Sequence, residues 1–190
     1  MARLHPIWNR WRALVRSDFE RNGNWDSRLT AAIWRMGQVA DQERTPAGFL
    51  LRRAHTLVDQ VWVRAVVGAE LPRTIDVGPG VRLPHAGRGI VLHPDAKIGA
   101  GVTIYHRVTV GVSGLSGPPV IEDGAYLGTG AVVIGDVTVG AGAKVGANAV
   151  VVKDVPTGAT AVGVPGRVLE RPRRPAPDTA TPGPTKAHRR

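Results

Sequence analysis

The chain has 190 residues, 43% of them apolar, and carries 25 basic against 15 acidic side chains, for a net charge of +10. It has no cysteine, which excludes a disulfide framework, a thiolate nucleophile and any cysteine-ligated metal centre. No apolar run approaches the roughly 18 residues that span a bilayer, and the start of the chain does not resemble a signal peptide. We therefore expect a soluble cytoplasmic protein with no membrane partner.

Composition changes along the chain. Nineteen of the 24 glycines lie in residues 75–170, whereas all five tryptophans precede residue 63. The net charge is +5 over residues 1–74, zero over 75–170 and +5 over 171–190. No nucleic-acid-binding motif accompanies this charge, so it favours a solvated helical face and a disordered, basic, proline-rich tail. We expect no nucleic-acid partner.

Residues 8–67 are predicted to form three helices. The first has apolar residues at helical spacing: Trp8, Trp11, Val15 and Phe19. Asp26 can cap a second helix, whose apolar side is Leu29, Ile33, Met36 and Ala40. Thr45 and Pro46 form an N-cap and first-turn pair for the third, which Gly68 ends. Its apolar residues are Leu50, Ala54, Leu57, Val58, Val61, Trp62 and Ala65. We expect the tryptophans to lie in the core or in a subunit contact.

Apolar pairs recur every six residues after residue 75. Their first members are Ile75, Val81, Ile90, Ala96, Val102, Val108, Pro119, Ala125, Ala131, Val137, Ala143 and Ala149, and each second member lies two places further on. Three residues are inserted before Ile90 and five before Pro119. The alternation within each six indicates short strands with one buried side, separated by turns. Twelve units, three to a coil, predict four coils of a triangular β-solenoid.

This repeat, as in residues 96–101 and 143–148, resembles that of the hexapeptide-repeat acyltransferases. Residues 83–94, residues 163–167 and the helical preamble resemble more narrowly the serine acetyltransferase group. The resemblance implies a left-handed parallel β-helix, against the usual right-handed crossover rule. It also implies acetyl-CoA as co-substrate, a role in cysteine biosynthesis and a homotrimer whose helices could pair trimers. We expect a helical domain over 1–69, a β-helix acyltransferase domain over 70–170 and the tail over 171–190.

His85 and His106 lie one coil apart once the three inserted residues are subtracted, so they should occupy equivalent places on adjacent coils. An imidazole can remove a proton from a hydroxyl as that oxygen attacks a thioester. The resemblance implies that His85 is this base, and His106 is a candidate substrate contact. It also places Glu70 where the family has the carboxylate that orients the base. Asp76 competes with Glu70 for that role.

Cofactor binding is expected to be largely through the backbone, in a groove between neighbouring solenoids. By position, the small residues that the family has in this groove fall at Gly111, Gly128, Thr129 and Ala147. The basic residues available to the phosphates of acetyl-CoA are Lys144, Lys153 and Arg167.

Two departures from the family concern the acceptor. Pro84 stands where the family has an aspartate before the base, and the loop of residues 111–119 is short and lacks an Arg-His pair. Serine is still the first expectation, with a sugar or another small alcohol, taken by O- or N-acetylation, as the alternative. A zinc hydratase using His85, His93 and His106 is a second alternative, and a non-catalytic scaffold a third. The acyltransferase context leads us to expect no metal.

Overall fold

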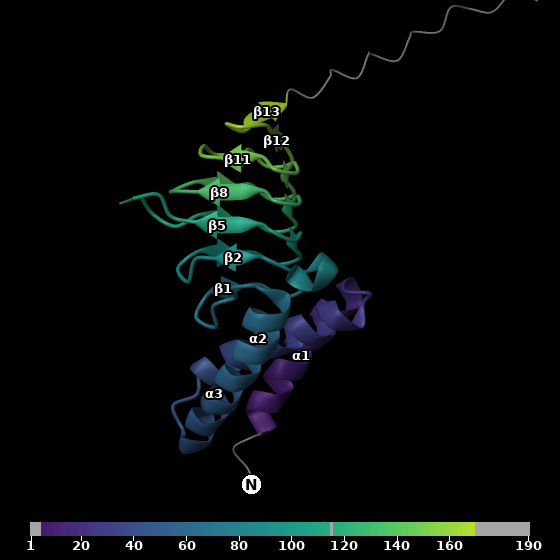
Figure 1. Cartoon of the computed structure of the whole chain (residues 1–190), viewed down its shortest axis with the longest axis vertical. Helices are drawn as coiled ribbons and strands as arrows, with labels where there is room; N and C mark the ends of the chain where they lie inside the picture. The colour runs from purple at the N-terminus through teal and green to yellow at the C-terminus, as the bar shows by residue number, and fades with distance from the viewer. Residues whose placement is uncertain (1–4, 115, 170–190) are drawn as a thin grey trace, which may run out of the picture.

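The computed structural model describes residues 5–114 and 116–169, and the predicted tail lies outside these residues. Three helices form one end of the molecule, and a tall stack of coils rises from them (Figure 1). The helices are α1 (His5–Arg21), α2 (Trp25–Asp41) and α3 (Pro46–Val58), and α3 continues as a π-helix, η1 (Asp59–Val67). Within the described residues, no helix is both long and apolar enough to cross a membrane.

The ends of the third helix follow the sequence prediction. The Thr45 hydroxyl accepts a hydrogen bond of 3.1 Å from the Gly48 amide, and Pro46 occupies the first turn. Gly68 ends η1 in the left-handed conformation, with φ of 70°. The first and last turns of a helix leave backbone N–H and C=O groups without partners inside the helix. Thr45 and Gly68 give some of these groups a hydrogen-bond partner.

The predicted cap of the second helix is wrong. Asn24 is the N-cap residue, and Asp26 lies inside the first turn of α2, where its carboxylate accepts a hydrogen bond of 2.8 Å from the Ser27 amide. A carboxylate is favourable in this turn because the amide groups at the N-terminal end of a helix carry partial positive charge. Asp26 therefore correctly indicated the start of a helix, but the N-cap is two residues earlier, at Asn24.

The packing of the helices also differs from their apolar patterns. α2 is enclosed on almost all sides, and its buried residues include Ile33, Trp34 and Arg35. In α3 and η1 the predicted apolar side faces outward instead, with Leu50 70%, Leu57 71% and Val61 65% exposed. On the opposite side of α3, the buried His55 packs against Gly37 of α2.

Short strands form the three faces of the coiled segment. The strands, in chain order, are β1 (Asp76–Val77), β2 (Val91–Leu92), β3 (Lys97–Ile98), β4 (Thr103–Ile104), β5 (Thr109–Gly111), β6 (Val120–Ile121), β7 (Tyr126–Leu127), β8 (Val132–Ile134), β9 (Thr138–Val139), β10 (Lys144–Val145), β11 (Val150–Val151), β12 (Thr160–Val162) and β13 (Arg167–Leu169). A 3₁₀ segment, η2 (Pro84–Gly87), precedes β2.

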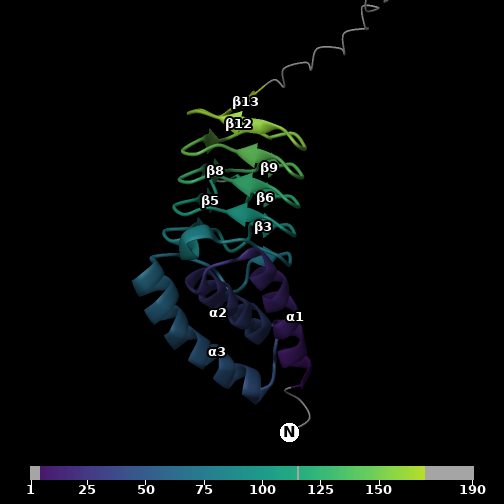
Figure 2. The ribbon, with the colours of Figure 1, turned by 90° about the vertical axis from the view of Figure 1, so that its right-hand side faces the viewer.

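Three sheets run along the stack. Sheet A contains β2, β5, β8 and β11; sheet B contains β1, β3, β6 and β9; sheet C contains β4, β7, β10, β12 and β13. Figure 2 shows β3, β6 and β9 of sheet B one above another. Neighbouring strands are parallel except for β12 and β13, which are antiparallel. The fold is the left-handed parallel β-helix that the resemblance implied.

The strand register confirms the six-residue repeat and both insertions. Val77 pairs with Ile98, Ile98 with Ile121 and Ile121 with Val139, so the inserted residues leave the ladder undisturbed. The predicted inward pairs from Ala125 to Val151 are all buried. Stacked coils therefore hydrogen-bond along the axis while their apolar ladders fill the interior.

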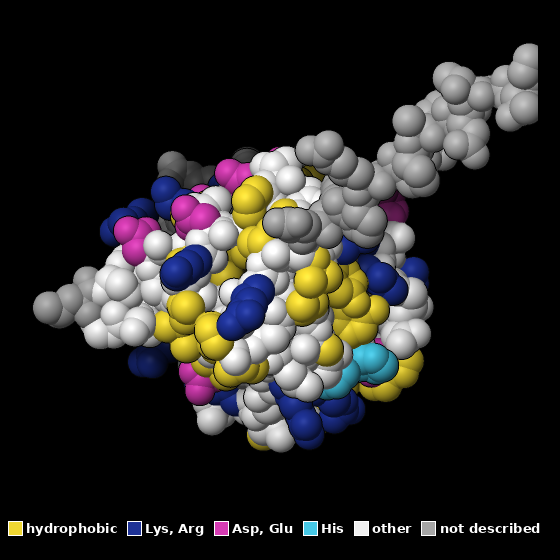
Figure 3. All heavy atoms as spheres, turned by 90° about the horizontal axis from the view of Figure 1, so that it is seen from above, with side chains coloured by type: hydrophobic (Ala, Val, Ile, Leu, Met, Phe, Trp, Pro, Cys, Tyr) yellow, Lys and Arg dark blue, Asp and Glu magenta, His cyan; other side chains and the backbone are white. Residues whose placement is uncertain are grey.

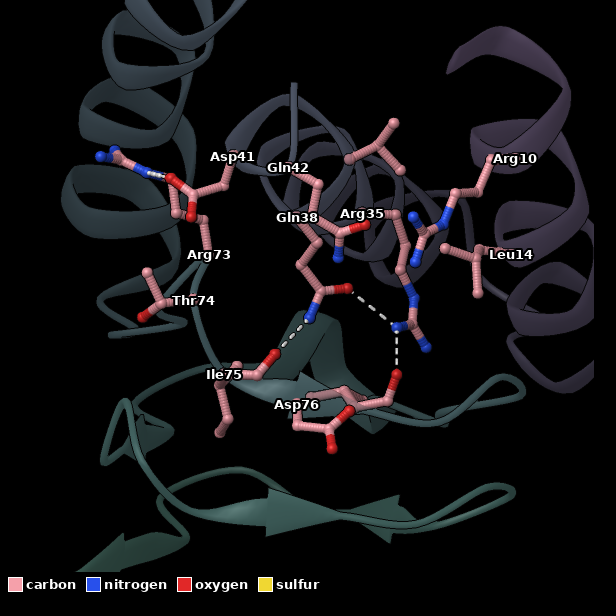
Figure 4. Close-up of a pocket in the computed structure, with 12 residues that line it drawn as sticks. Arg10, Leu14, Arg35, Gln38, Asp41, Gln42, Arg73, Thr74, Ile75 and Asp76 are labelled. Atoms are coloured by element: carbon pink, nitrogen blue, oxygen red, sulfur yellow. Dashed lines mark hydrogen bonds and ion pairs between the residues drawn. The ribbon is translucent and has the colours of Figure 1, made fainter. Parts of the chain in front are cut away.

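Side chains of α1 and α2 close the lower end of the β-helix. The buried Arg35 forms an ion pair of 2.7 Å with Asp18 and donates to the carbonyls of Val77 and Gly78 at 2.9 and 2.6 Å. Gln38 donates to the Ile75 carbonyl at 3.0 Å. Figure 4 shows Arg35 and Gln38 over this coil, beside a cleft of about 310 Å³. The open strand edge is thereby given partners, which buried backbone groups require.

Candidate active site

Successive corners between sheet C and sheet A stack into one edge of the prism. We call this the C–A edge; its corners are residues 84–89, 105–107, 128–130 and 146–148. The Gly130 amide donates to the His106 carbonyl at 3.0 Å, and the Asn148 amide donates to the Thr129 carbonyl at 2.8 Å. Hydrogen bonds therefore hold neighbouring corners at fixed height, which makes the edge a rigid support for side chains.

His85 lies on the first corner of this edge. Its backbone and that of Ala86 are left-handed, with φ of 57° and 60°. The His85 ring is exposed and meets the His106 ring edge to face, with centroids 4.9 Å apart. The predicted stacking of these two residues on adjacent coils is therefore confirmed. The Nδ1 atom of His106 is buried and has no hydrogen-bond partner among the described residues.

Two tyrosines that were not among the predicted site residues complete an aromatic cluster. Tyr105 lies 6.3 Å from His85 and 5.2 Å from Tyr126, measured between ring centroids. The pKa of Tyr126 is raised, chiefly because partial burial disfavours the phenolate and also because Tyr126 shares a hydrogen bond with Tyr105. The sequence offered one indication of this cluster: the chain has only two tyrosines, and both lie next to predicted corners.

The two candidate carboxylates lie on different faces. Glu70 pairs with Val91 in an isolated bridge, which extends sheet A by one coil below β2. The Glu70 carboxylate is exposed on the sheet that leaves the His85 corner. Asp76 lies in β1 of sheet B, the face opposite the C–A edge. Among the described residues, no ion pair joins His85 to either carboxylate, but only Glu70 lies on a face that borders His85.

The candidate cofactor residues fall into separate groups. Gly128, Thr129 and Ala147 lie on the C–A edge, above His106. A Cβ atom at Gly128 would come within 2.8 Å of the Ala147 amide nitrogen, so this corner requires glycine. Gly111 and Lys153 lie instead where sheet A passes into sheet B, which we call the A–B edge.

The basic candidates are all exposed but do not converge in one chain. Lys144 lies in β10, and Arg167 lies in β13, two strands further along sheet C. Lys153 lies on the A–B edge, across sheet A from the corner that carries Ala147. The chain alone therefore does not bring the three cations to one phosphate group.

The three histidines of the hydratase alternative are also divided. His93 lies on the A–B edge, where its Nδ1 atom accepts a hydrogen bond of 3.3 Å from the Asp95 amide. His85 and His106 share the C–A edge. Histidine side chains reach the surface on one side of the molecule when it is seen from above (Figure 3). Over residues 5–114 and 116–169, no three potential ligand residues gather around one point.

Known proteins share both the repeat and the fold. The family model described as bacterial transferase hexapeptide (six repeats) matches residues 118–153. The chain is 36% identical to serine acetyltransferase of Mycobacterium tuberculosis over 148 residues, which is 76% of this chain and 58% of that protein. It is 40% identical to serine acetyltransferase of Bacillus licheniformis over 141 residues, 73% of this chain and 62% of that protein. Thus it spans about three fifths of the length of these relatives.

A solved structure extends the likeness to the helices. Soybean serine acetyltransferase, in a structure described as complexed with serine, superposes with a TM-score of 0.67 at 32% identity. The superposition covers 86% of this chain and 69% of the soybean chain. A β-helix of six-residue repeats defines the class of hexapeptide-repeat transferases. Within that class, the chain belongs to the serine acetyltransferase family.

Proposed function

We propose that this protein is an acetyl-CoA-dependent O-acetyltransferase with serine as its first candidate acceptor and the cytoplasm as its place of action. The observation that carries the proposal is the exposed His85 on the C–A edge, in line with small residues at Gly128 and Ala147. Acetyl-CoA is a long molecule, and it could lie along this narrow edge with its thioester next to the base. The soybean relative that binds serine supports the choice of acceptor.

The proposed reaction is a direct transfer. His85 takes the proton of the acceptor hydroxyl while that oxygen bonds to the thioester carbonyl carbon, which gives a tetrahedral intermediate. The C–S bond then breaks, and the imidazolium returns the proton to the departing thiolate, giving an acetyl ester and free coenzyme A. Glu70 would orient the imidazole and stabilise its charged form. No acyl-enzyme is required.

A homotrimer would complete the site. Gly111 and Lys153 lie on the A–B edge, whereas Gly128 and Ala147 lie on the C–A edge of the same chain. A second copy could place its A–B edge against the C–A edge of the first, and both groups would then line one groove. Three copies joined in this way close into a ring with three equivalent sites.

A sugar is the second candidate acceptor, and the aromatic cluster favours it. Tyr105 lies beside His85, Tyr126 lies beside Tyr105, and both residues are partly exposed. Pro84 and the loop of residues 111–119 offer no charged group to bind the ammonium or carboxylate of an amino acid. Aromatic rings pack well against the apolar faces of sugars, with the phenol hydroxyl free to hydrogen-bond.

The test is release of coenzyme A thiol from acetyl-CoA with serine and, separately, with a panel of sugars. We expect His85→Ala to lower kcat at least about 100-fold with little change in the KM for acetyl-CoA, because the base acts only in the transition state. Lys97→Ala, a change at an exposed residue of β3 in sheet B, is the matched control and should keep kcat within about twofold. Near-normal turnover of His85→Ala with the best acceptor would overturn the proposal.

A further inference from the structure

We infer that Asn22, which directly follows α1, and Ser27, in the first turn of α2, are positioning residues for His85. The inference rests on the proposed function of His85 as the base. It assigns to the helical domain a role in setting the geometry of the reaction, in addition to closing the end of the β-helix.

The backbone around His85 needs external support. His85, Ala86 and Gly87 have φ values of 57°, 60° and 72°, so three consecutive residues are left-handed. This conformation brings the Cβ atom of an L-residue close to the following carbonyl, and only glycine adopts it freely. Of the three, only Gly87 is glycine. The segment therefore depends on contacts with its surroundings to keep this shape.

Those contacts come from Asn22, between α1 and α2, and from Ser27 in the first turn of α2. The Ser27 hydroxyl accepts a hydrogen bond of 3.1 Å from the Ala86 amide, which directly follows His85. The Asn22 side-chain oxygen accepts one of 2.8 Å from the Leu83 amide, and its nitrogen donates to the Val81 carbonyl at 2.8 Å. Two side chains thus hold backbone groups before and after His85.

The supporting side chains are themselves fixed. Ser27 and Asn22 are each 2% exposed, so no water competes for their hydrogen bonds. The backbone carbonyl of Asn22 accepts a hydrogen bond of 2.7 Å from the Arg28 side chain. The Asn22 side chain also donates to the Asp18 carbonyl at 2.8 Å. The direction of the His85 Cα–Cβ bond is therefore set by two packed helices.

Direction matters because the ring has little else to guide it. The His85 imidazole is exposed, and its described neighbours are the rings of Tyr105 and His106. A small rotation of the backbone at Ala86 would move the ring nitrogen away from a hydroxyl placed for attack. Misplacement of a reacting group by about 1 Å can cost about 100-fold in rate.

The experiment compares Ser27→Ala with Thr30→Val. Thr30 is one turn further along α2, is equally buried, and its hydroxyl contacts Asp26 and Trp62 instead of the His85 segment. We expect Ser27→Ala to lower kcat by about 10-fold to about 100-fold with the KM for acetyl-CoA unchanged. Thr30→Val should lose similar stability but keep kcat within about twofold. Ser27→Thr retains the hydroxyl and should keep most of the turnover.

Amide hydrogen exchange of the full-length variants gives a readout apart from activity. The Ala86 amide should exchange at least about 10-fold faster in Ser27→Ala than in the unmodified protein or Thr30→Val, because its acceptor is gone. Equal exchange in the two variants, or equal losses of kcat, would overturn the inference. Absence of acetyl transfer in the unmodified protein would instead overturn the proposed function, and the exchange rates would still decide whether Ser27 holds the segment.

Discussion

At the scale of single residues, the C–A edge combines two kinds of backbone position. Gly128 is glycine because a Cβ atom would collide with the next corner of the stack. His85 and Ala86 take a left-handed conformation although neither is glycine, and buried side chains of another element stabilise it. Unusual backbone geometry supported in this way is frequent at functional sites, because the surrounding structure can hold a side chain in one direction.

The partner of His85 can be tested at this scale. We expect Glu70→Gln to lower kcat by about 10-fold, less than His85→Ala does, since an amide can still orient the ring but cannot stabilise the imidazolium. Asp76→Asn removes a carboxylate from the opposite face and should leave kcat within about twofold. Steady-state kinetics with saturating acetyl-CoA checks both variants. Loss of activity in Asp76→Asn, together with normal Glu70→Gln, would show that the partner is assigned wrongly.

At the scale of elements, α3 packs on α2 through a buried histidine. His55 is 3% exposed, and a Cβ atom at Gly37 of α2 would overlap its imidazole, so the close approach of the two helices depends on glycine. Burial lowers the pKa of His55, because the imidazolium loses its water. Arg73 lowers this pKa further, while Asp59 acts in the opposite direction. The fold therefore favours neutral His55.

This preference predicts acid sensitivity of the folded state. The pKa of His55 is lowered from 6.5, so the unfolded chain binds its proton first as pH falls. The contribution of His55 to the free energy of unfolding should be constant above pH 6.5. Between pH 6.5 and the lowered pKa, this contribution should fall by up to about 1.4 kcal/mol for each pH unit. Urea unfolding at pH 7.5, 6.5 and 5.5 measures the slope. His55→Gln should flatten it and His93→Gln should not; equal slopes in all three proteins would contradict the prediction.

At the scale of the whole molecule, the outward side of α3 and η1 exposes more large apolar side chains than is usual for a protein surface. Leu50, Leu57 and Val61 are each at least 65% exposed and follow one helical stripe. Trp25 is 71% exposed and lies 5.7 Å from the Trp62 ring, which extends the apolar surface. Contiguous apolar surface of this kind is typical of contacts between subunits. The α3 part of this surface lies at the helical end of the molecule, below the coils (Figure 2).

We therefore expect the helical ends of two trimers to meet through α3. Leu57→Glu should convert a hexamer to a trimer, because a buried carboxylate at the contact costs more than the contact gains. Thr56→Glu, which adds the same charge beside the stripe, should leave the mass unchanged. Light scattering of both variants checks the assembly, and thiol release should stay within about twofold. A mass unaffected by Leu57→Glu would argue against this contact.

The sequence by itself determined the β-helix and the place of His85 on it. Its period of six and its two insertions fix which residues share a corner, because each coil repeats the same local alternation of inward and outward side chains. The stacking of His85 on His106 follows from that register. The hydroxyl of Thr45 and the conformation of Gly68 are likewise local, so the limits of the third helix could be read from the chain.

Only the tertiary structure decided what depends on contacts between distant segments. The burial of α2 on nearly all sides, and the outward turn of the apolar side of α3, follow from where the helices meet each other and the lowest coil. The pairing of Tyr105 with Tyr126 depends on neighbouring coils. Ser27 reaches the Ala86 amide across 59 residues of sequence, and no local pattern marks such a contact. Helical periodicity gives the faces of a helix, but the partner that covers each face is set by packing of the whole chain.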